Sequence, residues 1–354
     1  MLESLTQQEN APDFSVLILV STVEPQYEKT ATVQVRNLLL PYCNRLKLAL
    51  ADAATARLID SHLRIHGFDA QVAGMHGYAA VRNMQLLVPA TLGAEVIIAL
   101  DDDEVIAPDY VRRAVAWVGK FLKGQRITGI AGPYLDAEGN AYLPEAPQTG
   151  NIFADKPFFM NQTMYGLLNQ QDQLAETPMA LGGNMVFHRQ LFTQVGFDPS
   201  ITRGEDIDYV INARLAGQSF HFDPRLTITH LPPRHYESPA YGKLRQDVIR
   251  FVYEREKLRL GNLTPEAFYP YPGRFLEEDL MTQACQALQM ATTPEMVAHF
   301  GDLEVILTAA QHHAIDQAPR YFEFAHQWPE LMAVLMRDTT LPDELRQTMP
   351  MEAE

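Results

Sequence analysis

The sequence predicts an α/β fold, in which a mostly parallel sheet is flanked by helices, followed by an α-helical C-terminal extension. Short apolar runs of strand length alternate with helical patterns as far as about residue 230. Such alternation is typical of β-α-β units and a parallel sheet. From about residue 238 the spacing of apolar residues is helical throughout, which predicts helices that each bury one face.

The expected elements follow the chain in a regular order. Strands are predicted over 15–20, 46–51, 69–74, 96–100, 126–132, 185–187, 220–222 and 226–229. Helices are predicted over 30–42, 53–65, 77–92, 188–195 and 207–216, after 107–109, and later over 244–258, 277–291, 296–318 and 328–337. Turn chemistry over 136–140 predicts a hairpin. Residues 144–178, rich in Pro, Asn and Gln, are expected to be irregular.

The chain of 354 residues is long enough for one large domain and an extension. We divide it into a disordered leader (1–12), an α/β domain (13–237) and a helical C-terminal region (238–354). The leader is polar and acidic, so it does not resemble a secretory signal. The early apolar run over 14–20 is too short to span a bilayer. We therefore expect a cytoplasmic protein without a transmembrane segment.

Composition excludes several classes of partner. The formal net charge is −16 and the isoelectric point is near 5.1, whereas nucleic-acid binding needs a basic surface. Adhesion to anionic lipid is disfavoured for the same reason. The two cysteines, Cys43 and Cys285, lack metal-ligand spacing and are expected to be buried rather than paired.

The most informative stretch is the apolar run 96–100 followed by Asp101, Asp102, Asp103 and Glu104. Four consecutive carboxylates at a buried strand end are costly, because like charges repel and each must lose water. A divalent cation held by oxygen ligands removes that cost, and Mg²⁺ or Mn²⁺ is usually shared with substrate phosphates. Ligands of open α/β sheets also bind beyond the carboxyl ends of strands. An acidic surface loop is the alternative interpretation.

Two further clusters follow at strand or helix ends. Glu205, Asp206 and Asp208 begin a predicted helix, and His230 ends a predicted strand, with His235 close behind. Each cluster is weak alone, since acidic first turns of helices are common. Their order along the chain strengthens the interpretation as a site.

Taken in order, these features resemble a GT-A type nucleotide-sugar glycosyltransferase, close to glycosyltransferase family 2. The resemblance covers residues 14–235. Its motifs are, in order, an apolar strand with a loop carrying Glu24, a strand end at Asp52, Arg82-Asn83, the DxD-like Leu100-Asp101-Asp102-Asp103, Gly182-Gly183-Asn184, Glu205-Asp206 and His230. The family's Pro-x-Tyr-Asn-Glu after the first strand is absent, so the base of the donor stays open.

The resemblance implies a metal-dependent transfer of a hexose from a UDP- or GDP-linked donor to an acceptor hydroxyl. It assigns Asp206 as the base and Glu205 as an orienting carboxylate. Donor-binding residues would be Glu24, Asp52, Arg82, Asp101 and Asp102. Acceptor-binding residues would be Gly183 and Asn184. Mn²⁺ or Mg²⁺ would be held by Asp101, Asp103 and His230. Arg82 could instead pair with an acid of the cluster.

Basic residues also gather on the predicted helix over 244–258. They are Lys243, Arg245, Arg250, Arg255, Lys257 and Arg259. We expect Arg245 to help to bind an acceptor that carries negative charge. The alternative is a solvated face whose cations pair with acids of the same helix.

Several alternatives remain open at this point. A retaining glycosyltransferase of the mannosylglycerate or glucosyl-phosphoglycerate synthase kind would not need Asp206 as a base. A sugar nucleotidyltransferase also uses a parallel sheet and acidic metal ligands, but the loop 21–29 has no glycine. A binding module without turnover is the third. The sequence leaves the sugar and assembly into a homo-oligomer undecided.

Overall fold

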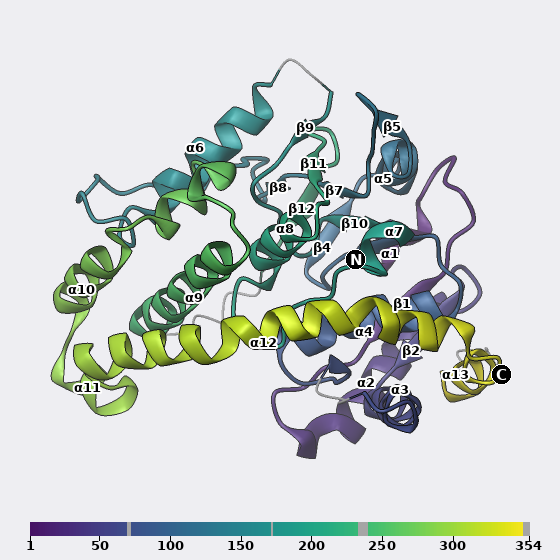
Figure 1. Cartoon of the computed structure of the whole chain (residues 1–354). Coiled ribbons are helices and arrows are strands. Elements are labelled where there is room, and N and C mark those ends of the chain that lie inside the picture. The colour runs from purple at the N-terminus through teal and green to yellow at the C-terminus, as the bar shows by residue number, and fades with distance from the viewer. Residues whose placement is uncertain (69–71, 171–172, 233–239, 350–354) are drawn as a thin grey trace.

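The computed structural model describes residues 1–68, 72–170, 173–232 and 240–349 (Figure 1). The strands are β1 (Val16–Leu19), β2 (Leu48–Ala51), β3 (Val96–Ala99), β4 (Glu104–Ile106), β5 (Phe121–Leu122), β6 (Gln125–Arg126), β7 (Gly129–Ala131), β8 (Tyr134–Leu135), β9 (Ala175–Glu176), β10 (Met185–His188), β11 (Phe220–Phe222) and β12 (Ile228–His230).

The helices cover the strands and then form the C-terminal part of the chain. They are α1 (Leu2–Thr6), α2 (Glu28–Leu39), α3 (Ala53–Ile65), α4 (Tyr78–Thr91), α5 (Tyr110–Trp117), α6 (Lys156–Leu168), α7 (Arg189–Phe192), α8 (Glu205–Leu215), α9 (Ala240–Leu260), α10 (Leu280–Ala291), α11 (Pro294–Phe300), α12 (Leu303–Arg337) and α13 (Leu341–Thr348). The predicted α/β class and the helical C-terminal region are confirmed. None of the helices in these described ranges combines the length and apolarity that a bilayer crossing would need.

The described sheets are mixed, which corrects the expectation of a mostly parallel sheet. The largest has the order β3-β10-β7-β11-β9, and β10 is antiparallel to both β3 and β7. Met185, the first residue of β10, pairs with Ala99, the last of β3. The chain therefore enters β10 from the edge where β3 ends, and the Gly182-Gly183 turn comes to the acidic loop.

A second, three-stranded sheet brings His230 to the acidic loop. Its order is β4-β12-β8, and β12 pairs antiparallel with β4, so that His230 lies opposite Glu104. The turn of the predicted hairpin is confirmed, but its strand pairing is wrong. Asp136 accepts the turn hydrogen bonds from Glu138 and Asn140, but the preceding strand β8 pairs with β12.

Helix α12 connects the two main apolar cores. Figure 1 shows it running along α9 at one end and past α4 toward α13 at the other. Trp328 and Leu331 pack in the core shared with α4 and β3, whereas Ile306 and Ala310 pack in the core shared with α6 and α9. The C-terminal helices thus share both cores with the sheet-bearing part. A boundary at residue 237 falls outside the described residues, so our domain division stays a prediction.

Four segments differ from the sequence expectations. Residues 2–6 are helical rather than disordered, because Leu5 packs into a core and the Ser4 hydroxyl accepts a hydrogen bond from the Ile106 N–H. Helix α6 replaces part of the expected irregular segment. The break expected between 318 and 328 is absent, since α12 is continuous. Of the strand expected over 69–74, residues 69–71 lie outside the described chain and 72–74 are not a strand.

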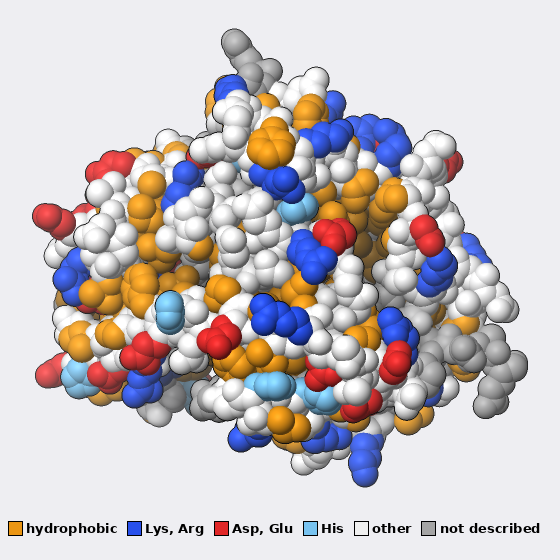
Figure 2. Space-filling view, turned by 45° about the vertical axis from the view of Figure 1, so that its right-hand side comes forward, with side chains coloured by type: hydrophobic (Ala, Val, Ile, Leu, Met, Phe, Trp, Pro, Cys, Tyr) orange, Lys and Arg blue, Asp and Glu red, His pale blue; other side chains and the backbone are white. Residues whose placement is uncertain are grey.

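The surface carries charges of both signs. Figure 2 shows Lys and Arg side chains interspersed with Asp and Glu over most of one face, and hydrophobic side chains in small groups among polar atoms. Isolated apolar groups of this kind are usual on soluble domains. The distinctive charges of this fold are instead buried.

Lys257 of α9 is the centre of a buried ionic cluster. Its ammonium group is fully buried and contacts Asp198 at 2.9 Å and Asp208, and it donates to Asn212 Oδ1 at 2.9 Å. Burial would lower the pKa of Lys257, but the two carboxylates outweigh this and raise it. Burial raises the pKa of Asp208 to about 6, although Lys257 opposes the shift. The cluster therefore fastens α8 to α9.

Replacing Lys257 with Met leaves two buried carboxylates without a cation, so we expect the free energy of unfolding to fall by about 3–5 kcal/mol. Arg259→Met is a matched control two residues away, because Arg259 is exposed and pairs with Glu256 of the same helix. We expect the control to change it by less than about 1 kcal/mol. Urea unfolding followed by circular dichroism measures both. Equal effects of the two substitutions would contradict the role of the cluster.

Candidate active site

The acidic loop after β3 is braced from inside by Glu104. This residue is fully buried, and its carboxyl group accepts a hydrogen bond from the Asp101 N–H at 2.8 Å. A Cβ at Gly183 would lie 1.9 Å from Glu104 Oε1, so only glycine fits there. Burial raises the pKa of Glu104 to about 8. Glu104 thus shapes the loop, whereas the side chain of Asp102 is exposed.

Arg82 joins the acidic loop to helix α8. It is buried, and its guanidinium pairs with Asp101 (Nη1–Oδ1, 3.0 Å) and with Glu205 (Nε–Oε1, 3.4 Å). Burial would lower the pKa of Arg82, but these carboxylates raise it above its usual value. Burial raises the pKa of Glu205, Asp206 raises it further, and Arg82 opposes both. Of our two hypotheses for Arg82, the structure shows the ion pair. A donor contact stays a prediction.

Asp103 and His230 form the second part of this edge. His230 Nε2 lies 3.4 Å from Asp103 Oδ2, and the Leu231 N–H donates to the Asp103 carbonyl at 2.8 Å. The Tyr134 ring packs on the imidazole, with centroids 4.9 Å apart. Both side chains are partly exposed, so they can reach a ligand.

The three expected metal ligands, Asp101, Asp103 and His230, do not form one cluster. Among the described residues no group of three or more His, Cys, Asp or Glu side chains is placed to hold a metal ion. Asp101 turns toward Arg82 instead of joining Asp103 and His230, because the buried guanidinium needs its charge. His235 lies outside the described residues. The remaining pair fits a cation that takes its other ligands from substrate phosphates and water.

Asp206 faces the turn that leads into β10. Its Oδ2 accepts a hydrogen bond from the Gly182 N–H at 3.0 Å, and its Oδ1 accepts one from the Ile207 N–H at 2.8 Å. A Cβ at Gly182 would lie 2.4 Å from Arg82 Nη2, so glycine lets the turn approach the ion pairs. The structure therefore brings Asp206, Glu205, Arg82 and Asp101 together at one edge.

Two of the expected acceptor residues have other contacts. Asn184 is fully buried, donates to the Pro133 and Leu226 carbonyls and accepts from the Tyr110 hydroxyl. Its assignment to the acceptor is therefore wrong, because every polar group of its side chain is used inside the fold. The Gly183 N–H donates to the Tyr134 hydroxyl at 2.6 Å. Gly183 thus connects the turn before β10 to Tyr134 of β8.

The predicted basic face of α9 does not exist as one surface. Arg250 is buried against Tyr271, Asp247 and Glu254, and Lys257 is buried in the ionic cluster. Arg245 is half-buried, and within the described part of the chain it forms no ion pair. A role of Arg245 in acceptor binding stays a prediction.

The expected donor residues near β1 and β2 belong to a separate two-stranded sheet. Asp52 caps α3 by accepting a hydrogen bond from the Ala54 N–H at 2.8 Å, and Glu24 is exposed. His76, which the sequence did not reveal, contacts Glu28 Oε1 at 2.7 Å and the Thr22 carbonyl at 2.9 Å. The hydrogen bond with Glu28 raises the pKa of His76. Donor binding by Asp52 and Glu24 stays a prediction.

Comparison with known families gives one match to a family model. Residues 96–246 match the model of a family described as glycosyl transferase family group 2. This part of the chain is therefore similar to glycosyltransferases of that group. The match covers less than half of the chain, but it includes β3, the acidic loop, Asp206 and His230. No curated protein sequence matches significantly.

Several solved structures are similar to this chain, and one of them is a mannosyltransferase by name. A mannosyltransferase, PcManGT from Pyrobaculum calidifontis in complex with GDP-Man and Mn²⁺, is 15% identical over 98% of this chain and 81% of its own, with a TM-score of 0.47. TarS of S. aureus (15%, 91% and 52%, TM-score 0.42) and GalNAc-T7 with UDP, GalNAc and Mn²⁺ (14%, 90% and 58%, TM-score 0.37) follow. The chain spans little more than half the length of the last two. At these TM-scores we draw nothing further from them.

Replacing Arg82 with Met leaves buried Glu205 and the nearby Asp101 unpaired. We expect the free energy of unfolding to fall by about 3 kcal/mol in the ligand-free protein. The effect of adding Asp101→Asn should be less than additive, because the two residues share one interaction. Exposed Arg112, which pairs with Asp109, gives the control Arg112→Met. Urea denaturation measures all four variants. A role of Arg82 limited to a bound phosphate predicts no loss without ligand.

Proposed function

We propose that this glycosyltransferase moves a hexose from a UDP- or GDP-linked donor to an acceptor hydroxyl, with inversion and with help from Mn²⁺ or Mg²⁺. The observation that carries the proposal is the convergence of the ends of β3 and β12 with the start of α8. Asp103 follows β3, His230 ends β12, and Asp206 lies in the first turn of α8. Ligands of α/β sheets bind at such an edge.

Asp103 and His230 would hold the cation together with the donor diphosphate. The cation would supply positive charge for the departing diphosphate, which is the chief electrostatic need of this transfer. Asp101, fixed by Arg82, would orient the ribose or a water on the cation. Asp102 is exposed beside them and is available to the donor. Asp52 and Glu24 would contact the nucleobase side.

Asp206 is the proposed base. A carboxylate at the start of a helix can accept the proton of an acceptor hydroxyl within hydrogen-bond reach. Two N–H donors orient Asp206 toward the Gly182 turn. Buried Glu205, held by Arg82, positions the first turn of α8.

A metal-dependent thermal shift tests the donor site. We expect Mn²⁺ with one of UDP-glucose, UDP-N-acetylglucosamine or GDP-mannose to raise the melting temperature by several degrees, because binding to the folded state alone stabilises it. EDTA, Asp103→Asn or His230→Gln should abolish the rise, since each removes the cation or a ligand of it. Glu138→Gln, in an exposed turn, is the control. The proposal is wrong if no donor stabilises the protein, or if EDTA changes nothing.

Donor hydrolysis without an acceptor tests the base. We expect Asp206→Asn to lower the rate of nucleoside diphosphate release by about 10²–10⁴-fold, because an amide cannot take the proton of the attacking water. The metal-dependent thermal shift should remain, since Asp206 is not a cation ligand. Substantial activity in this variant would favour the retaining alternative, which needs no base at this position.

A further inference from the structure

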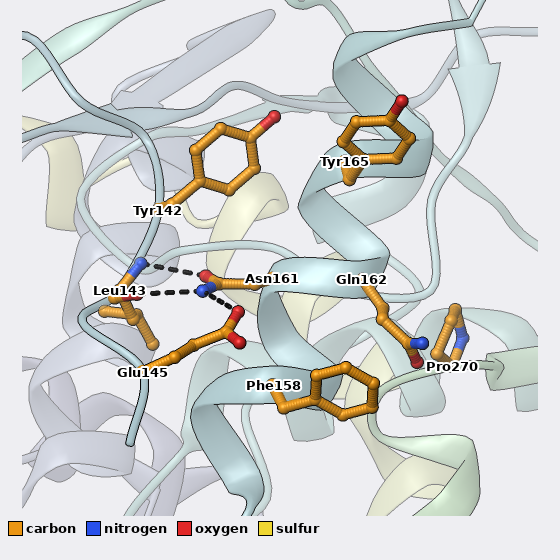
Figure 3. Close-up of a pocket in the computed structure, with 8 residues that line it drawn as sticks. All are labelled: Tyr142, Leu143, Glu145, Phe158, Asn161, Gln162, Tyr165 and Pro270. Carbon is orange, nitrogen blue, oxygen red and sulfur yellow. Dashed lines mark hydrogen bonds between the residues drawn. The ribbon is translucent and has the colours of Figure 1, made fainter. Parts of the chain in front are cut away.

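A hollow outside the active site lies between helix α6 and the segment 142–145. Its volume is about 680 Å³, and it is lined by Tyr142, Leu143, Glu145, Phe158, Asn161, Gln162, Tyr165 and Pro270 (Figure 3). This volume is within the range of small-molecule sites. None of the lining residues belongs to the donor, metal or catalytic set described above. The hollow is therefore a second candidate binding site.

Two tyrosines give the hollow its apolar surface. Tyr142 is 43% exposed and Tyr165 is 63% exposed. Figure 3 shows them on opposite walls, Tyr142 on the loop and Tyr165 on α6, with Phe158 below. Aromatic rings with a polar end suit ligands that are partly apolar and partly wet. A sugar ring is such a ligand, because its C–H groups pack on an aromatic face while its hydroxyls stay hydrated.

The walls are held together by Asn161. This residue is only 8% exposed, and its amide accepts a hydrogen bond from the Leu143 N–H at 2.8 Å. The same amide donates to the Leu143 carbonyl at 2.8 Å and to Glu145 Oε1 at 2.6 Å. The loop is thus fixed to α6 before any ligand arrives, and a preformed site loses less entropy on binding.

The polar lining groups indicate the charge of the ligand. Among the described residues that line the hollow, Glu145 is the one carboxylate and none is Lys or Arg. The Asn161 amide is used within the fold, which leaves the amide of Gln162. A carboxylate and an amide can hydrogen-bond to neighbouring hydroxyls. An anionic ligand would meet the charge of Glu145 with no cation to offset it. The hollow therefore favours a neutral sugar.

The hollow belongs to the same packed unit as the active site. Met164 and Leu167 of α6 pack in one core with Met179 and Ile207, and Ile207 directly follows the proposed base Asp206. A saccharide in the hollow and an acceptor end near Asp206 would consequently be held by one rigid element. This arrangement suits an acceptor longer than a single sugar.

We propose that this hollow binds a neutral sugar unit of a saccharide acceptor, with Tyr142 and Tyr165 as stacking faces and Glu145 as a hydroxyl acceptor. The assignment of this ligand to the acceptor rests on the proposed function. Binding itself needs neither donor nor cation, so the two can fail separately.

Saturation-transfer NMR on the full chain in EDTA, without donor, tests the site. The probes are chitotriose, cellotriose and mannotriose, each alone, with tri-galacturonate as the anionic counterpart and a proline-rich decapeptide as another ligand of aromatic grooves. We expect at least one neutral trisaccharide to bind. Tyr142→Ala and Tyr165→Ala should each weaken it by about tenfold, which corresponds to a modest stacking energy. Phe121→Ala removes an exposed aromatic ring elsewhere and should leave binding unchanged.

Charge provides the second arm of the test. Glu145→Gln should allow tri-galacturonate to bind where the natural protein rejects it. The proposal is overturned if no neutral trisaccharide binds, if either tyrosine variant binds as well as the natural protein, or if only the decapeptide binds. Loss of the metal-dependent thermal shift with intact trisaccharide binding would instead contradict the proposed function alone.

Discussion

The contact of one buried guanidinium with two carboxylates sets the arrangement of the candidate active site. Arg82 of α4 lies between Asp101 after β3 and Glu205 at the start of α8. Without it, Asp101, Glu205 and Asp206 would face one another in a partly desolvated space, where like charges repel strongly. The guanidinium is always charged and presents several donors in a fixed plane. It can therefore hold two acids at once, and the Gly182 turn comes close because no side chain intervenes.

A second buried cation holds the same helix one turn further along. Lys257 of α9 holds Asp208, one turn beyond Glu205, together with Asp198. Arg82 and Lys257 thus fasten the start of α8 at Glu205 and Asp208, and Asp206 lies between these two residues in the sequence. Nearby, Glu254 is fully buried, and burial raises its pKa to about 8 even though Arg250 opposes the shift. Placing so many ionic groups inside is costly, and the common element that they position is the first turn of α8.

The sequence predicted where some strands end better than it predicted how the strands pair. Apolar runs ending in Asp101 and His230 locate strand ends, because strand length and acidity are local signals. They cannot show that β10 runs antiparallel, since direction depends on long-range pairing. Helix α6 was missed because its buried face includes Asn161 and Thr163, which carry no apolar periodicity. The partners of Arg82, Asn184 and Lys257 likewise depend on residues far away in the chain, so their roles appear only in the fold.

The distribution of cations also bears on the acceptor. The sequence places six basic residues near or within α9, which favoured an anionic acceptor. In the structure Arg250 and Lys257 are buried and neutralised by acids of the fold, so they offer no charge to a ligand. The candidate active site itself is rich in carboxylates, and the hollow beside α6 has Glu145 but no cation. An acceptor meeting both surfaces would gain nothing from negative charge of its own. A neutral saccharide is therefore more compatible with this protein than the anionic acceptor that the composition of α9 favoured.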